Sequence, residues 1–185
     1  EVSRGLLEDN LDELIEILNS DSAKNGQIDY LIFSDTFVVL APDIEPKSYP
    51  WFLRVCKDLI VRSINIEMPL RGAIGVGPLF FSQHPPILLG EPFVDTYEYC
   101  EDQDWVGLLL TPSATSALRK NDLEPLHHDF VSDPQIPLRK KPAVGVVAYR
   151  FQNGSSNFPS PLLPKLNQMK HFAKESTEKC KYERT

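Results

Sequence analysis

Two polar residues, Ser34 and Asp35, separate two apolar runs that are typical of β-strands. The runs are 28–33 and 36–40, so the pattern predicts a hairpin with Asp35 at its tip. A carboxylate in that place could bind Mg²⁺ or Mn²⁺, which are hard cations that also bind phosphate oxygens. The alternative is purely structural, because Ser and Asp also suit a tight turn that binds nothing.

A second candidate is Arg71, which lies near the start of an apolar segment, 70–76, that contains two glycines. A planar guanidinium can bind phosphate oxygens in pairs, so Arg71 could hold the β- or γ-phosphate of a nucleotide. An arginine at the edge of a strand, with no ligand, explains the same residue equally well.

Other residues of chemically active types favour ordinary roles. His127, His128 and Asp129 are consecutive, and no further ligand lies at helical or hairpin spacing from them. The group therefore does not indicate a metal centre. Ser34 has no local arrangement with His and Asp, which disfavours a hydrolase. The three cysteines show neither paired nor metal-ligand spacing and are interpreted as structural or incidental. The basic run 139–141 is typical of a solvated loop.

Periodic apolar residues predict the elements that would position Asp35 and Arg71. Stripes at three- and four-residue spacing predict amphipathic helices over 6–18 and 51–63, the second with Pro50 in its first turn. The other expected elements are a strand, bend and strand over 70–76 and 78–81, a helix over 90–101, a strand over 105–110, a helix over 113–120, a central strand over 143–151 and a helix over 166–179.

This order of elements predicts an α/β (α+β) protein with a mostly antiparallel sheet covered by helices. A strand before the first helix would complete a ferredoxin-like βαββαβ core, and that strand is missing from the given sequence. We expect one core. Residues 1–151 would form the main domain, and 152–185 would be a loop-rich extension of it with many prolines.

Composition excludes several classes of function. The net charge of −7 disfavours binding to a nucleic-acid backbone, which needs a clustered basic face. No apolar run reaches the ~18 residues of a membrane span, and the first residues lack the pattern of a signal peptide. We therefore expect a cytoplasmic protein with no nucleic-acid or membrane partner. A nucleotide held together with metal ions is compatible with the acidic charge.

Three blocks, in one order, resemble the class III nucleotidyl cyclases. The 28–40 hairpin resembles the second metal-binding hairpin of that family, and Asp35 matches its aspartate. The 70–77 block resembles the strand that bears the triphosphate-binding arginine, which Arg71 matches. The 87–108 block is similar to the pattern of glycine, helix, acidic residues, tryptophan and glycine in bacterial members.

The resemblance covers roughly residues 6–151, and within the family it is nearest to the bacterial anti-phage type called Pycsar. It implies a homodimeric enzyme that converts a nucleoside triphosphate into a 3′,5′-cyclic nucleotide and pyrophosphate, as a second messenger in anti-phage defence. Two Mg²⁺ or Mn²⁺ ions would position the triphosphate and activate the 3′-hydroxyl. Asp35 would be one ligand, and its partner carboxylate is expected upstream of Glu1.

Two positions depart from the family pattern. In purine cyclases the helix of the third block carries an asparagine and a transition-state arginine, and counting from Gly90 these positions hold Val94 and Glu98. A glutamate cannot stabilise the negative charge that grows on the departing pyrophosphate, so another cation, such as Arg4 or Lys120, would have to replace the arginine. The departures favour an alternative, a catalytically inactive cyclase-homology module that binds nucleotide or dimerises. A diguanylate-cyclase relative is disfavoured, because its Gly-Gly-acidic-Glu-Phe signature does not occur.

The expected base specificity rests on the pair of residues that selects adenine in the family. The position of the selecting lysine falls at Asp29, with Tyr30 beside it, and its partner carboxylate falls at Ile87. Because neither member of the pair is present, the sequence predicts a pyrimidine substrate. UTP is favoured over CTP, since the acceptor–donor–acceptor edge of uracil could match a tyrosine hydroxyl and an aspartate.

Overall fold

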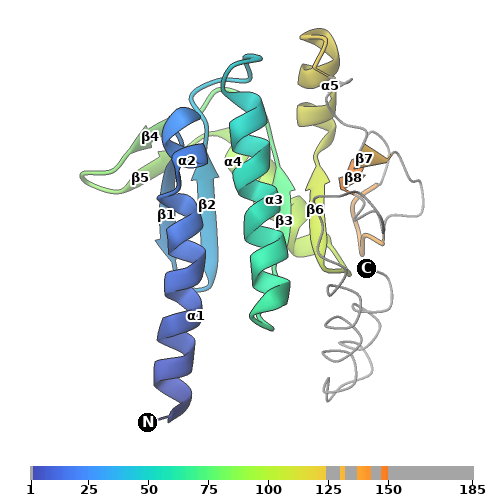
Figure 1. The fold of residues 1–185 in the computed structure, drawn as a ribbon. Coiled ribbons are helices and arrows are strands. Elements are labelled where there is room, and N and C mark those ends of the chain that lie inside the picture. The colour runs from blue at the N-terminus through green and yellow to red at the C-terminus, as the bar shows by residue number, and fades with distance from the viewer. Residues whose placement is uncertain (1, 124–129, 132–136, 143–146, 150–185) are drawn as a thin grey trace. The chain divides into compact units, whose positions relative to one another are not determined.

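Figure 1 shows the computed structural model, in which residues 2–123, 130–131, 137–142 and 147–149 are described. The chain divides into two compact units, Glu1–Met68 and Pro69–Thr185. The first unit contains α1 (Val2–Leu18), α2 (Asp21–Asn25), β1 (Asp29–Phe33), β2 (Thr36–Leu40) and α3 (Tyr49–Asn65). The second contains β3 (Arg71–Ile74), β4 (Phe80–Ser82), β5 (Ile87–Leu89), α4 (Glu91–Asp102), β6 (Gly107–Leu110), α5 (Pro112–Lys120), β7 (Phe130–Val131) and β8 (Val147–Tyr149).

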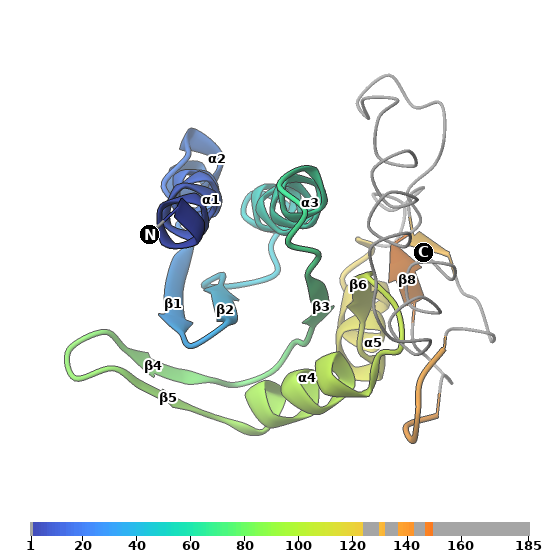
Figure 2. The ribbon, with the colours of Figure 1, turned by 90° about the horizontal axis from the view of Figure 1, so that it is seen from below.

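In the first unit, α1 and α3 pack together on one side of the β1–β2 hairpin (Figure 2). The apolar stripes predicted from the sequence form this packing, and Leu14 and Ile64 are completely buried in it. Pro50 lies in the first turn of α3, where its missing N–H costs no helical hydrogen bond. Both helices predicted for this part of the chain are therefore confirmed.

The hairpin predicted over 28–40 is also confirmed. Strands β1 and β2 pair in antiparallel register, and Phe33 lies opposite Thr36. The two residues between them, Ser34 and Asp35, form the turn. The left-handed backbone of Gln27, with φ of 51°, leads the chain from α2 into β1.

The second unit contains a four-stranded sheet with the order β3–β6–β8–β7. Strands β3 and β6 are parallel, whereas β8 is antiparallel to both of its neighbours. Helix α4 packs on β3, and a buried cluster joins Tyr99 of the helix to Leu109 of β6 and to Trp105, which precedes that strand. The strand predicted over 143–151 is present in part as β8, between two other strands of this sheet.

The two strands predicted over 70–76 and 78–81 are present as β3 and β4, but the hairpin expected from them is wrong, because they do not pair with each other. Strand β4 pairs with β5, a strand that the periodicity did not indicate. The residues between β3 and β4 pass close to α4 instead. A Cβ atom on Gly75 would lie 1.9 Å from Oγ1 of Thr96, and one on Gly77 would lie 2.5 Å from Cγ of Pro92. Both glycines serve this close approach to the helix.

The helices predicted over 90–101 and 113–120 are confirmed as α4 and α5. Thr111 caps α5, since its side-chain oxygen accepts from the amide of Ala114 at 3.3 Å. In the described part of the chain, no helix is both long enough and apolar enough to cross a membrane. The boundary expected after residue 151 and the helix expected over 166–179 lie outside the described residues. The general α+β class is observed, and the ferredoxin-like arrangement remains a prediction.

Candidate functional site

Asp35 lies exposed at the tip of the first hairpin. Within the described ranges, its carboxylate forms no hydrogen bond and no ion pair. Ser34, beside it, has a φ of 55°, which a residue with a side chain seldom adopts. In an ordinary turn an aspartate carboxylate often bonds to its own backbone, and that is not so here. The turn therefore leaves this carboxylate available to a ligand.

The two residues predicted to read the base, Asp29 and Tyr30, are consecutive in β1. Consecutive side chains of a strand project from opposite faces, so the two cannot line one pocket together. The hydroxyl of Tyr30 donates to the side-chain oxygen of Asn19 at 3.4 Å, and Asn19 follows α1 directly. Tyr30 is thus directed towards the helices, and Asp29 lies exposed on the other face. This corrects the expectation that both residues contact one base.

Arg71 is the first residue of β3, and its guanidinium is already bound within the second unit. Nη2 lies 2.5 Å from Oε1 of Glu101, while Nη1 donates to the carbonyl oxygens of Glu101 at 3.4 Å and Gln103 at 3.3 Å. The side chain of Arg71 is 30% exposed and that of Glu101 is 52% exposed. A phosphate could therefore reach the guanidinium from solvent, but it would compete with the Glu101 carboxylate.

Two buried side chains beside this ion pair were not singled out as candidates from the sequence. Gln103 is completely buried, and its Nε2 donates to the carbonyl oxygen of Gly72 at 2.9 Å. Its Oε1 and the Nε1 of Trp105 have no hydrogen-bond partner in the described part of the chain. The ring of Trp105 lies over Gly107, where a Cβ atom would be 2.0 Å from Cζ3. The residue types alone would not have predicted that Gln103 and Trp105 are buried beside this ion pair.

In the basic run 139–141, Arg139 and Lys140 are exposed, as expected for a solvated loop, whereas the Lys141 side chain is held against α4. Nζ of Lys141 lies 2.8 Å from Oε2 of Glu98 and 3.5 Å from Oδ1 of Asp95, and it lies 4.5 Å above the ring of Tyr99. These carboxylates raise the pKa of Lys141, with the hydrogen bond to Glu98 as the main cause. The position at which the resemblance expects a cation thus holds Glu98 paired with a lysine from another segment.

The buried carboxylate of Asp102 fixes the same segment. It accepts the backbone N–H of Lys140, at 3.0 and 2.9 Å from its two oxygens, and that of Lys141 at 2.6 Å. Hydrogen bonds to a charged acceptor are among the stronger ones in proteins. The end of α4 therefore determines where the Lys141 ammonium lies.

The remaining candidate residues fall into the two units separately. Asp29, Tyr30 and Asp35 belong to the first unit, whereas Arg71 and Ile87 belong to the second. Ile87 is half-buried in β5, opposite Ser82, and its apolar side chain offers no hydrogen bond to a base. In the described ranges, no three His, Cys, Asp or Glu side chains come together as metal ligands.

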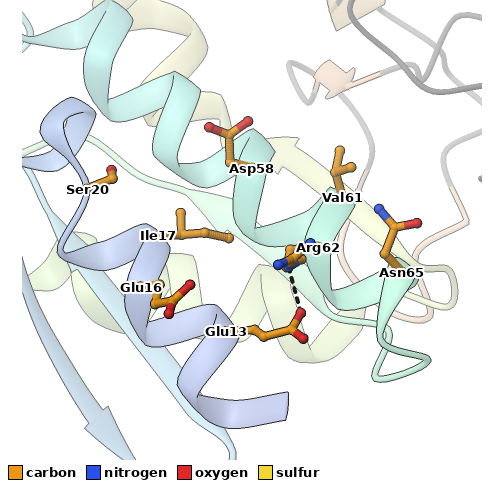
Figure 3. Close-up of a pocket in the computed structure, with 8 residues that line it drawn as sticks. All are labelled: Glu13, Glu16, Ile17, Ser20, Asp58, Val61, Arg62 and Asn65. Carbon is orange, nitrogen blue, oxygen red and sulfur yellow. Dashed lines mark ion pairs between the residues drawn. The ribbon is translucent and has the colours of Figure 1, made fainter. Parts of the chain in front are cut away.

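A polar groove in the first unit involves none of the residues predicted from the sequence. It lies between α1 and α3 (Figure 3) and has a volume of about 400 Å³. An ion pair between Nε of Arg62 and Oε2 of Glu13, at 2.7 Å, bridges the two helices, and burial raises the pKa of Asp58. The lining residues are Glu13, Glu16, Ile17, Ser20, Asp58, Val61, Arg62 and Asn65.

Comparison with known proteins gives no match among family models, curated proteins or solved structures.

Proposed function

We propose that this protein is a metal-dependent nucleotidyl cyclase that forms a 3′,5′-cyclic nucleotide and pyrophosphate from a nucleoside triphosphate. The observation that supports this proposal best is the unpaired carboxylate of Asp35 at the tip of the β1–β2 hairpin. A carboxylate that the fold does not use for a turn or an ion pair is available as a cation ligand. Its position between two apolar strands is also one of the three features on which the resemblance to cyclases rests.

The chemistry of Asp35 fits one ligand of a Mg²⁺ or Mn²⁺ site, since a free carboxylate is the donor that these cations prefer. When bound, the cations would neutralise triphosphate charge and favour attack by the 3′-hydroxyl on the α-phosphate. The role of Asp35 itself would be to hold a cation at the tip of the β1–β2 hairpin.

Arg71 is proposed to bind a phosphate of the substrate. Its guanidinium is about one-third exposed, and Glu101, its present partner, is half-exposed and can turn into solvent. The carbonyl oxygens of Glu101 and Gln103 would continue to hold Nη1, leaving Nη2 for the phosphate. The chain would thus orient the guanidinium before the substrate arrives.

For the base, Asp29 is the better candidate of the two residues in β1. Its side chain is exposed on the face of β1 away from α1, whereas Tyr30 lies on the face towards the helices. An aspartate carboxylate accepts hydrogen bonds, so it would match the amino group of cytosine or the N3–H of uracil. We propose a pyrimidine nucleotide as the substrate in anti-phage signalling, and Asp29 alone does not distinguish UTP from CTP.

A catalytically inactive cyclase-homology module is the second candidate. The observation that favours it is the pairing of Glu98 with Lys141, because the lysine charge is then neutralised by two carboxylates of α4. A neutralised lysine would stabilise a departing pyrophosphate poorly. Such a module would bind nucleotide without turnover.

The direct test incubates the full-length protein with each of the four ribonucleoside triphosphates and Mn²⁺, and separates the products by mass. Cyclic UMP or cyclic CMP formed faster than the purine products supports both the activity and the base. Faster formation of cyclic AMP or cyclic GMP refutes the assignment of the base. No turnover, with nucleotide binding that Arg71→Ala weakens in calorimetry, supports the inactive module.

A further inference from the structure

The two short strands β4 and β5 of the second unit carry apolar side chains that are open to solvent. Five of their six residues are Phe, Ile or Leu, and none of them is buried. Phe80 and Leu89 lie directly opposite each other and are 58% and 62% exposed. Within this unit the hairpin extends from the start of α4, away from β6 and β8 (Figure 2). A two-stranded sheet is marginally stable in water unless a further strand or a helix packs against it.

Helix α4 follows β5 after Gly90, and its exposed face is both apolar and acidic. The exposed residues of α4 recur at spacings of three and four, which places them on one side of the helix. Two of them are apolar and three are acidic, namely Val94, Tyr97, Glu91, Glu98 and Glu101. We refer to these residues, together with Phe80 and Leu89, as the hairpin surface.

The charge of this part of the chain is acidic throughout. Residues 72–118 contain six Asp or Glu residues and no Lys or Arg. Lys141 and Arg71 pair with Glu98 and Glu101, and the side chains of both glutamates remain half-exposed. The carboxylate of Glu91 forms no hydrogen bond and no ion pair with any residue that the structure describes. The α4 part of the hairpin surface therefore attracts cations and repels anions.

This charge distinguishes between the occupants that could cover the hairpin surface. A second copy in a two-fold contact would bring the same carboxylates of α4 towards each other. The surface of a cell membrane carries anionic lipids, which would repel those carboxylates. A polypeptide segment that has both apolar and basic side chains is complementary to the apolar strands and to α4 together.

We propose that the hairpin surface binds a basic, amphipathic segment of a partner protein as a strand added beside β5. Among the described residues β5 pairs only with β4, so its outer edge has backbone donors and acceptors for another strand. Alternate side chains of the added strand would lie on the face that carries Phe80 and Leu89. Because β5 ends two residues before Glu91, a Lys or Arg at the end of the added strand would reach the carboxylates of α4. This proposal does not depend on the proposed activity.

The contact would be small and reversible. A large side chain buries about 200 Å², so the four half-exposed apolar side chains of the hairpin surface present roughly 400 Å². Interfaces of that size belong to transient complexes rather than to permanent ones. We therefore expect a dissociation constant in the micromolar range.

The test measures binding of a labelled peptide to the full-length protein by fluorescence anisotropy. The peptide has about eight residues, in which Lys and Val alternate. Two comparison peptides separate the two requirements, because one has Gln in place of Lys and the other has Gly in place of Val. We expect the Lys–Val peptide to bind at least about tenfold more tightly than either of them. It should also increase the hydrogen-exchange protection of the β5 amides.

Leu89→Ser on the hairpin and Glu91→Lys on α4 should each raise the dissociation constant of the Lys–Val peptide at least about fivefold, and only the second effect should shrink as salt is added. The matched controls lie in the first unit. Phe33→Ser removes an exposed aromatic, and Asp21→Lys reverses an exposed charge that, like Glu91, lies in the first turn of a helix. Both controls should leave the constant unchanged. Circular dichroism melts verify that each variant is folded.

Several outcomes would overturn the proposal. The first is absence of binding by the Lys–Val peptide. Equal binding of the Lys–Gly peptide would reduce the interaction to net charge, and equal binding of the Gln–Val peptide would remove the need for a basic partner. Displacement of the Lys–Val peptide by neutral phosphatidylcholine vesicles would assign the surface to lipid. A light-scattering mass of two chains that Leu89→Ser lowers to one chain would assign it to a second copy.

Discussion

Arg71 and Glu101 form an ion pair, 2.5 Å between Nη2 and Oε1, that links the first residue of β3 to the last turn of α4. The Glu101 carboxylate is bound to the Arg71 guanidinium, which is the group proposed to bind a phosphate. Since both side chains are partly exposed, solvent screens the pair and its contribution to stability is small.

Glu101→Gln is expected to lower the free energy of unfolding by only about 0.5 kcal/mol. Arg71→Met should cost more, about 1–2 kcal/mol, because the carbonyl oxygens of Glu101 and Gln103 also lose a donor. Urea denaturation measures both values. Arg54→Met, which removes an exposed pair with Asp58 at 3.8 Å, is the control and should change little. Equal losses for Glu101→Gln and Arg71→Met would contradict this interpretation.

Ser34→Gly is expected to raise the free energy of unfolding by about 1 kcal/mol, because glycine adopts a φ of 55° without the steric cost of a side chain. The matched control is Ser116→Gly in the middle of α5, which should lower it by about 0.5 kcal/mol. Thermal denaturation compares the two variants. A loss of stability in Ser34→Gly would mean that the hydroxyl makes an essential contact.

Gly75→Ala is expected to destabilise the protein by about 2 kcal/mol, because the added methyl group would lie 1.9 Å from Oγ1 of Thr96. The double variant with Thr96→Ala should recover part of that loss, since it removes the contacting oxygen. Denaturant titration of both single variants and the double variant gives the coupling free energy between positions 75 and 96. A double variant no more stable than Gly75→Ala would show that the clash is not with Thr96.

The thiols of Cys56 and Cys100 should be unreactive in the folded protein at pH 8. Burial raises the pKa of Cys56 to about 12 and that of Cys100 to about 11, so the reactive thiolate forms only at much higher pH. Alkylation followed by mass mapping should label both residues slowly in the native protein and rapidly in urea. Native labelling as fast as in urea would contradict the observed burial.

The sequence was sufficient to predict the elements whose periodicity is regular. The helical stripes around Leu14 and Leu59, the turn at Ser34 and the cap at Thr111 are local signals, and each corresponds to an observed element. Strand β5 was missed, and its three apolar residues show no alternation with polar ones. The parallel pairing of β3 with β6 was also missed, since strands distant in sequence leave no local pattern.

The candidate site was predicted less completely for the same reason. The type of residue at Arg71 predicts a phosphate-binding role, but Glu101, its ion-pair partner, lies thirty positions later. Lys141 is more than forty positions from the carboxylates of α4 that hold it. Contacts of this kind depend on the packing of α4 against β3, which a single sequence does not specify.

The most direct test of the proposed activity compares Asp35→Asn with Asp12→Asn in the full-length protein. Both changes remove one exposed carboxylate from the first unit, and only Asp35 lies at the hairpin tip. The measurement is the rate of cyclic pyrimidine nucleotide formation with Mn²⁺, alongside melts that verify folding. The account predicts at least a hundredfold loss for Asp35→Asn and wild-type turnover for Asp12→Asn. Equal turnover in wild type and Asp35→Asn would contradict it.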